Sequence, residues 1–94
     1  MDRAEAVNLI REIDRECKDI RGTSIMLMEP DPNDALAKGY RVQIRMKATP
    51  MRLRCLKTVA GQYDLQVNVA ADNWLVTIYT PKKAIEQTSG QGLM

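Results

Sequence analysis

The sequence predicts an α+β fold: a two-layer sandwich in which two helices cover one face of a four-stranded, mainly antiparallel sheet. Two segments carry apolar residues at helical spacing, and four shorter segments have the length and composition of strands. These segments follow one another in the order αββαββ. Each helix has one apolar stripe, which favours placing both helices on the same side of the sheet. The 94 residues leave room for one domain, predicted at residues 1–81.

The first helix is predicted to begin at Asp2 and to end at Gly22. Glu5 follows Asp2 by three residues, as in a capping box, and Gly22 is typical of a left-handed C-terminal cap. Its buried stripe consists of Ala6, Leu9, Ile10, Ile13, Cys17 and Ile20. The stripe spans less than three heptads, so packing on the domain's own core is favoured over a coiled coil.

The first pair of strands is predicted at residues 23–29 and 40–47. The first strand is apolar on both faces, which is typical of a central strand or one covered on both sides. Residues 30–39 contain two prolines and predict a long connection with at most one helical turn. The second strand alternates, with an inner face of Tyr40, Val42, Ile44 and Met46 and an outer face of Arg41, Gln43, Arg45 and Lys47.

The second helix is predicted from Thr49–Pro50 to about Ala60, with Thr49 as its N-cap and Gly61 as its stop. Its buried stripe is predicted to contain Leu53, Leu56, Val59, Ala60 and Tyr63. Residues 65–70 and 74–79 predict two strands joined by a turn at 71–73, and Pro81 ends the second of them. Residues 82–94 have no usable period and are predicted to form a flexible tail.

Charge is distributed unevenly along the chain. Residues 1–37 contain five basic and nine acidic side chains, whereas residues 38–57 contain seven basic and no acidic ones. The formal net charge of +2 therefore hides a concentrated basic segment. This segment includes the second strand and most of the second helix, so it predicts a basic patch.

We expect the basic patch to lie on the sheet face that the helices leave open. Arginine can donate two hydrogen bonds to a phosphate, amides can bind base edges, and a tyrosine can stack on a base. Open sheets bind single-stranded RNA in some folds. The candidate binding residues are Arg41, Gln43, Arg45, Lys47, Arg54, Lys57, Asn68 and Tyr79, and Lys82 and Lys83 could widen the patch. The sequence thus predicts a small non-enzymatic binding module that contacts nucleic acid or an acidic protein.

Two other interpretations use the same residues. Exposed strands commonly carry Arg and Lys for solubility alone, and the overall pI of about 8.7 is modest for a nucleic-acid-binding domain. Leu75 and two residues of the first strand must also lie on the open face, where they could form an apolar patch. A homodimer formed through the sheet face or a sheet edge would bury that patch.

Several kinds of chemistry lack the residues they need. The chain has no histidine, which removes the usual catalytic triads and histidine-ligated metals, and no glycine-rich phosphate loop. Glu29, Asp31 and Asp34 do not have the spacing of a calcium loop. We therefore expect no enzymatic activity, no cofactor and no metal. For Trp74, packing at the rim of the core is favoured over stacking on a ligand.

The cysteines and the N-terminal residues give predictions about the cellular compartment of the protein. Cys17 is predicted to be a small core residue and Cys55 to be more exposed, with no disulfide framework. The charged N-terminal residues do not resemble a signal peptide, and no apolar run is long enough to cross a membrane. These features predict a cytoplasmic protein.

Overall fold

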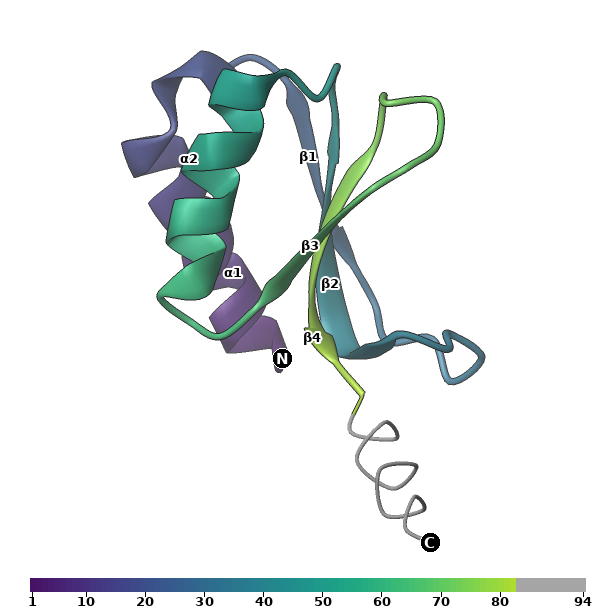
Figure 1. Ribbon diagram of the computed structural model, residues 1–94. Helices are drawn as coiled ribbons and strands as arrows, with labels where there is room; N and C mark the ends of the chain where they lie inside the picture. Colours follow the sequence, from purple (N-terminus) through teal and green to yellow (C-terminus); the bar gives the residue numbers. More distant parts are fainter. Residues whose placement is uncertain (83–94) are drawn as a thin grey trace, which may run out of the picture.

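The computed structural model describes residues 1–82 and has the predicted αββαββ order (Figure 1). Its elements are helix α1 (Arg3–Glu16), the 3-10 helix η1 (Lys18–Ile20), strands β1 (Ser24–Met28) and β2 (Ala37–Arg45), helix α2 (Pro50–Gly61), and strands β3 (Gln66–Val69) and β4 (Val76–Pro81). The predicted α+β class is therefore confirmed.

The four strands form one antiparallel sheet in the order β1-β2-β4-β3. Both helices lie on the same side of this sheet, and no helix or strand within residues 1–82 covers the other side (Figure 1). The sequence predicted that β1 would be central or covered on both faces, and this is wrong. β2 and β4 are the central strands because each pairs along both of its edges, whereas β1 pairs only with β2.

The core lies between the helices and the inner face of the sheet. Cross-strand register places Val42 opposite Ile78 and Ile44 opposite Val76, and all four side chains are fully buried. The helices complete the core with Leu9 and Ile13 from α1 and with Leu56, Val59 and Ala60 from α2. Alternation after the register shift therefore sends Arg41, Gln43 and Arg45 of β2 to the open face.

Both predicted N-caps are confirmed. The Asp2 carboxylate accepts from the Glu5 N–H at 2.8 Å, and the Glu5 carboxylate accepts from the Asp2 N–H at 2.7 Å. Thr49 Oγ1 accepts from the Arg52 N–H at 3.3 Å, with Pro50 in the first turn of α2. Local sequence is sufficient to set these two helix starts.

The first helix is shorter than predicted. α1 ends at Glu16 because Cys17 leaves the helical region, with φ −108° and ψ 79°. A separate 3-10 turn follows, and Gly22, with φ +89°, ends that turn rather than α1. Ile20 is nevertheless buried, so the apolar stripe continues across the break.

Strand β2 begins at Ala37, three residues earlier than predicted, and has an irregularity between Lys38 and Val42. At this point the N-terminus packs against the sheet: the Tyr40 N–H donates to the Met1 carbonyl at 2.8 Å. Gly39 adopts φ +76° beside this contact. No helix occurs among residues 30–36; Asp34 instead closes a turn by donating its N–H to the Asp31 carbonyl at 3.0 Å.

Candidate functional site

The open face of the sheet carries mostly uncharged polar and thioether side chains. Register places Met26 beside Gln43, Gln43 beside Thr77, and Thr77 beside Asn68. The Gln43 amide donates to Thr77 Oγ1 at 3.4 Å. Tyr79 lies in the same hollow as Arg41 and Asn68. The structure thus brings together five of the predicted binding residues on this face: Arg41, Gln43, Arg45, Asn68 and Tyr79.

The side chain of Arg41 binds groups of the β1–β2 connection. Its guanidinium contacts the Asp34 carboxylate at 3.5 Å and donates to the Glu29 carbonyl at 2.9 Å, and its side chain is only 14% exposed. Arg41 Nε is buried without a hydrogen-bond partner among residues 1–82. Arg41 therefore fastens the β1–β2 connection, which leaves less of its guanidinium for an external anion than the sequence indicated.

Asp34 is the anchor of that connection. Its carboxylate accepts from the Ala37 N–H at 3.0 Å and the Leu36 N–H at 2.8 Å. These two hydrogen bonds, followed by the charges of Arg41 and Lys82, lower the pKa of the Asp34 carboxyl below its ordinary value. Lys82 also donates its backbone N–H to the Leu36 carbonyl at 2.9 Å and Nζ to the Asp34 carbonyl. The tail predicted at 82–94 thus starts with a bound residue, and the rest of it lies outside the described part.

Two of the predicted binding residues lie on the opposite layer. Arg54 and Lys57 are exposed on α2, whose buried residues Leu56, Val59 and Ala60 face the sheet. Because α2 covers the inner face, Arg54 and Lys57 cannot reach the middle of the open face. Arg54 and Lys57 therefore lie outside the open face, and their part in binding stays a prediction.

Several cations lie instead where β2 ends and α2 begins; this junction is at the top of Figure 1. Arg45 and Lys47 are exposed at the end of β2, and Arg52 donates to the Lys47 carbonyl at 3.1 Å. One surface hollow joins Lys47 to Arg52, and a second joins Arg52 to Arg54. We call this surface the basic end; it consists of Arg45, Lys47, Arg52 and Arg54. None of the ion pairs formed among residues 1–82 involves these four side chains.

Trp74 directly follows Asn73, which binds the residue after Lys47 of the basic end. Its neighbour Asn73 accepts from the Ala48 N–H through its carbonyl at 2.9 Å and donates from its side chain to the Ala48 carbonyl at 3.3 Å. These contacts fasten the β3–β4 turn to the residue that follows Lys47. Trp74 is 55% exposed, so the prediction that it packs at the core rim is wrong.

Acidic groups near the basic end are few. Asp19 lines both hollows and Glu16 lines the one beside Arg54, while Asp72 accepts from the Trp74 N–H at 3.0 Å. Basic side chains therefore outnumber the acidic ones around this surface. Its chemistry suits an anionic ligand with a flat group that can stack on an indole.

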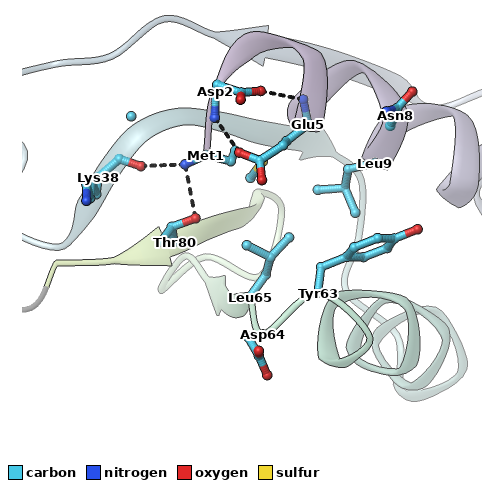
Figure 2. Close-up of a pocket in the computed structure, with 11 residues that line it drawn as sticks. Met1, Asp2, Glu5, Asn8, Leu9, Lys38, Tyr63, Asp64, Leu65 and Thr80 are labelled. Carbon is cyan, nitrogen blue, oxygen red and sulfur yellow. Dashed lines mark hydrogen bonds between the residues drawn. The ribbon is translucent and has the colours of Figure 1, made fainter.

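A separate hollow lies between the start of α1 and the loop after α2. Its volume is about 690 Å³, and Leu9, Tyr63 and Leu65 face it from opposite sides (Figure 2). Its main polar groups bind one another: Asp2 and Glu5 form the capping box, and the Met1 ammonium donates to Thr80 Oγ1 at 3.0 Å. This hollow therefore offers few free groups for orienting a ligand. Tyr63, predicted in the stripe of α2, is exposed at its rim.

The two cysteines form a disulfide that ties α2 to the residue after α1. Cys17 and Cys55 have Cα atoms 5.8 Å apart, although they are separated by 38 positions in sequence. The expectation of two separate thiols is wrong, because the break after Glu16 presents Cys17 to α2. Disulfides are uncommon in a reducing cytoplasm, so this pairing does not support the predicted compartment.

No group of three or more His, Cys, Asp or Glu side chains among residues 1–82 is placed to hold a metal ion. The loop acids serve the backbone: Asp31 accepts from the Asn33 N–H at 2.9 Å, and Asp34 caps the start of β2. No helix within the described part is long and apolar enough to cross a membrane.

Comparison with known proteins does not assign the chain to a family: no protein-family model matches it, and no curated protein or solved structure shows significant similarity to it.

Proposed function

We propose that this chain is a non-enzymatic module that binds single-stranded nucleic acid at its basic end. The observation that carries the proposal is the position of Trp74. Trp74 is exposed and directly follows Asn73, which is hydrogen-bonded to Ala48, the residue after Lys47. Lys47 and the other three cations of the basic end have no ion-pair partner among residues 1–82. Cationic side chains bind the phosphates of a strand, and an aromatic ring stacks on a base.

The arrangement favours a single strand over a duplex. Stacking on Trp74 needs a base whose face is free, and bases in a duplex are already stacked on one another. Arg45 also belongs to the open face, where Gln43, Thr77 and Asn68 offer amides and a hydroxyl to base edges. We propose that a strand passes from Trp74 across Arg45 towards these groups.

A fluorescence titration tests this proposal directly, because Trp74 is the only tryptophan in the chain. Addition of an oligothymidylate of about ten nucleotides, a length within the usual site size, is expected to quench the Trp74 emission. Three or four phosphate contacts predict that log K falls against log salt with a slope of about −2 to −3.

Matched variants separate a defined site from general attraction. Arg45→Ala with Lys47→Ala is expected to weaken binding at least about tenfold, since two phosphate contacts are lost. Arg3→Ala with Arg11→Ala removes the same net charge from exposed positions of α1 and should change affinity less than about twofold. Trp74→Leu should weaken binding by about five- to a hundredfold through loss of stacking.

Each outcome bears on the proposal. Equal weakening by both double variants would mean that the protein attracts nucleic acid through net charge alone. Absence of quenching at low salt would reject the proposal outright. An acidic protein that binds to the four cations with the same salt dependence, but is insensitive to Trp74→Leu, would replace nucleic acid as the partner.

A further inference from the structure

Strand β1 has an exposed edge with the composition of a pairing strand. Its sequence is Ser-Ile-Met-Leu-Met, with no charge and no proline, and β2 is its only neighbour in the sheet. Apart from pairing with β2, residues 24–28 make no backbone hydrogen bond to any other part of residues 1–82. Exposed edges of this kind are usually protected by charges, prolines or bulges. Pro30 and Pro32 limit the length of β1 but do not protect the strand itself.

We propose that β1 pairs antiparallel with β1 of a second copy of this chain, giving a two-fold dimer with an eight-stranded sheet. Pairing centred on Met26 would place Ser24 opposite Met28 and Ile25 opposite Leu27. Ile25 and Leu27 already pack against the core, so the two copies would join along their inner faces as well as along the edge. This proposal uses a different surface from the basic end and is independent of the nucleic-acid proposal.

The charges at the two ends of β1 select the antiparallel direction. Arg21 is exposed three residues before the strand, where it also contacts the Asp14 carboxylate at 3.9 Å, and Glu29 is exposed just after the strand. Asp31 adds a second carboxylate beyond the end of β1, where the charge of Arg41 is already paired with Asp34. Antiparallel pairing therefore brings the positively charged start of one β1 to the negatively charged end of the other, whereas parallel pairing would bring like charges together.

The other edge of the sheet is a poorer partner. β3 has only four residues, and its alternate residues Gln66 and Asn68 are polar. Asp64, with φ +57°, turns the chain immediately before it. Pairing of β1 with β3 of another copy would be head-to-tail and open-ended, whereas pairing of β1 with β1 closes after two copies.

Sedimentation equilibrium of the full chain tests the dimer. A five-residue strand pair is a small interface, so we expect a dissociation constant on the order of micromolar to tens of micromolar. Met26→Lys places a charge on the edge strand and should weaken association at least about tenfold, whereas Met26→Thr keeps an uncharged strand-forming residue and should change it less than about threefold. Asn68→Lys on β3 is the matched control and should leave the mass unchanged.

A charge-swap experiment distinguishes failed pairing from failed folding. Arg21→Glu and Glu29→Lys each create two like-charge contacts in a homodimer, and each should weaken association about five- to tenfold. An equimolar mixture of the two variants should restore dimers, because both contacts are then attractive. Restoration shows that both variants are folded.

Three results would overturn the proposal. The first is a monomer at concentrations up to about a millimolar, well above the affinity expected of a small interface. The second is a mass that keeps rising with concentration, which indicates open-ended pairing. The third is a dimer that is insensitive to Met26→Lys or that the mixture fails to restore.

Discussion

Asn73 and Ala48 exchange two hydrogen bonds across the top of the sheet, one at 2.9 Å and one at 3.3 Å. Asn73 makes this contact from the left-handed region, with φ +68°, which asparagine tolerates better than most residues. The β3–β4 turn is thereby fastened to the start of the β2–α2 connection. The location of Trp74 relative to Lys47 depends on this contact.

Asn73→Gly should separate the stability contributed by the side-chain hydrogen bond from the effect of the left-handed backbone conformation. Glycine accepts the positive φ without strain but cannot donate from a side chain, so we expect a loss of about 1 kcal/mol in unfolding free energy. Affinity for the oligothymidylate should fall as well, because Trp74 is less firmly positioned. Asn73→Ala should lose more stability, since it also strains the backbone. Urea unfolding and the Trp74 fluorescence titration measure the two effects.

Removal of the disulfide should destabilise the domain strongly. The bond between Cys17 and Cys55 closes a loop spanning 38 positions, and the loop-entropy model assigns such a closure about 4 kcal/mol. This is a large part of the stability expected for a domain of this size. Cys17→Ala with Cys55→Ala should lower the urea midpoint, and reductant should shift the unmodified chain to the same value. A midpoint that does not respond to reductant would show that the disulfide does not stabilise the fold.

Three glycines should respond differently to alanine. A Cβ on Gly39 would lie 2.4 Å from the Met1 carbonyl oxygen, and φ is +76°, so Gly39→Ala should lose more than about 2 kcal/mol. Gly22 has φ +89° but open space around it, so Gly22→Ala should lose about 1 kcal/mol. Gly61 also has open space and lies in α2, so Gly61→Ala should gain about 0.5–1 kcal/mol. Thermal unfolding of the three variants measures their stabilities, and a different order would contradict these conformational assignments.

Asp34 should contribute to acid stability. Its folded-state pKa is lower than its unfolded-state pKa, chiefly because the Ala37 and Leu36 N–H groups donate to the ionised form. Such a group stabilises the fold above the unfolded pKa, and the contribution is lost as pH falls from about 4 through the folded pKa. Asp34→Asn should therefore be less stable than the unmodified chain at pH 7, and the two should converge in acid. Parallel stability curves from pH 7 to pH 2 would contradict the assignment.

Local sequence signals predicted most of the fold. The Asp2–Glu5 capping box and the Thr49–Pro50 opening use side chains that satisfy neighbouring backbone groups, so a few residues suffice to locate both helix starts. The alternation in residues 40–47 predicted which side of β2 is buried. The position of β1 in the sheet, at an edge or in the centre, was not predictable. Strand order depends on which other strand pairs with β2, and a local pattern does not contain that information.

The candidate site was only partly predictable. The sequence correctly located the basic segment, and five of its candidate residues share the open face. It did not reveal that Arg41 would bind Asp34 seven residues earlier, or that α2 would carry Arg54 away from that face. For Trp74 the sequence favoured packing at the core rim over stacking on a ligand, whereas the structure leaves its side chain exposed. The sequence signal that could have identified it is an aromatic residue directly after a predicted turn.

The sequence by itself determined the number, type and order of the helices and strands, because caps, turn residues and apolar periodicity act over a few neighbouring positions. Tertiary structure alone decided that Cys17 meets Cys55, that Asn73 meets Ala48, and that β1 lies at an edge. These relationships join residues far apart in the chain. They arise only when the helices and strands pack into one core, since no local interaction brings such residues together.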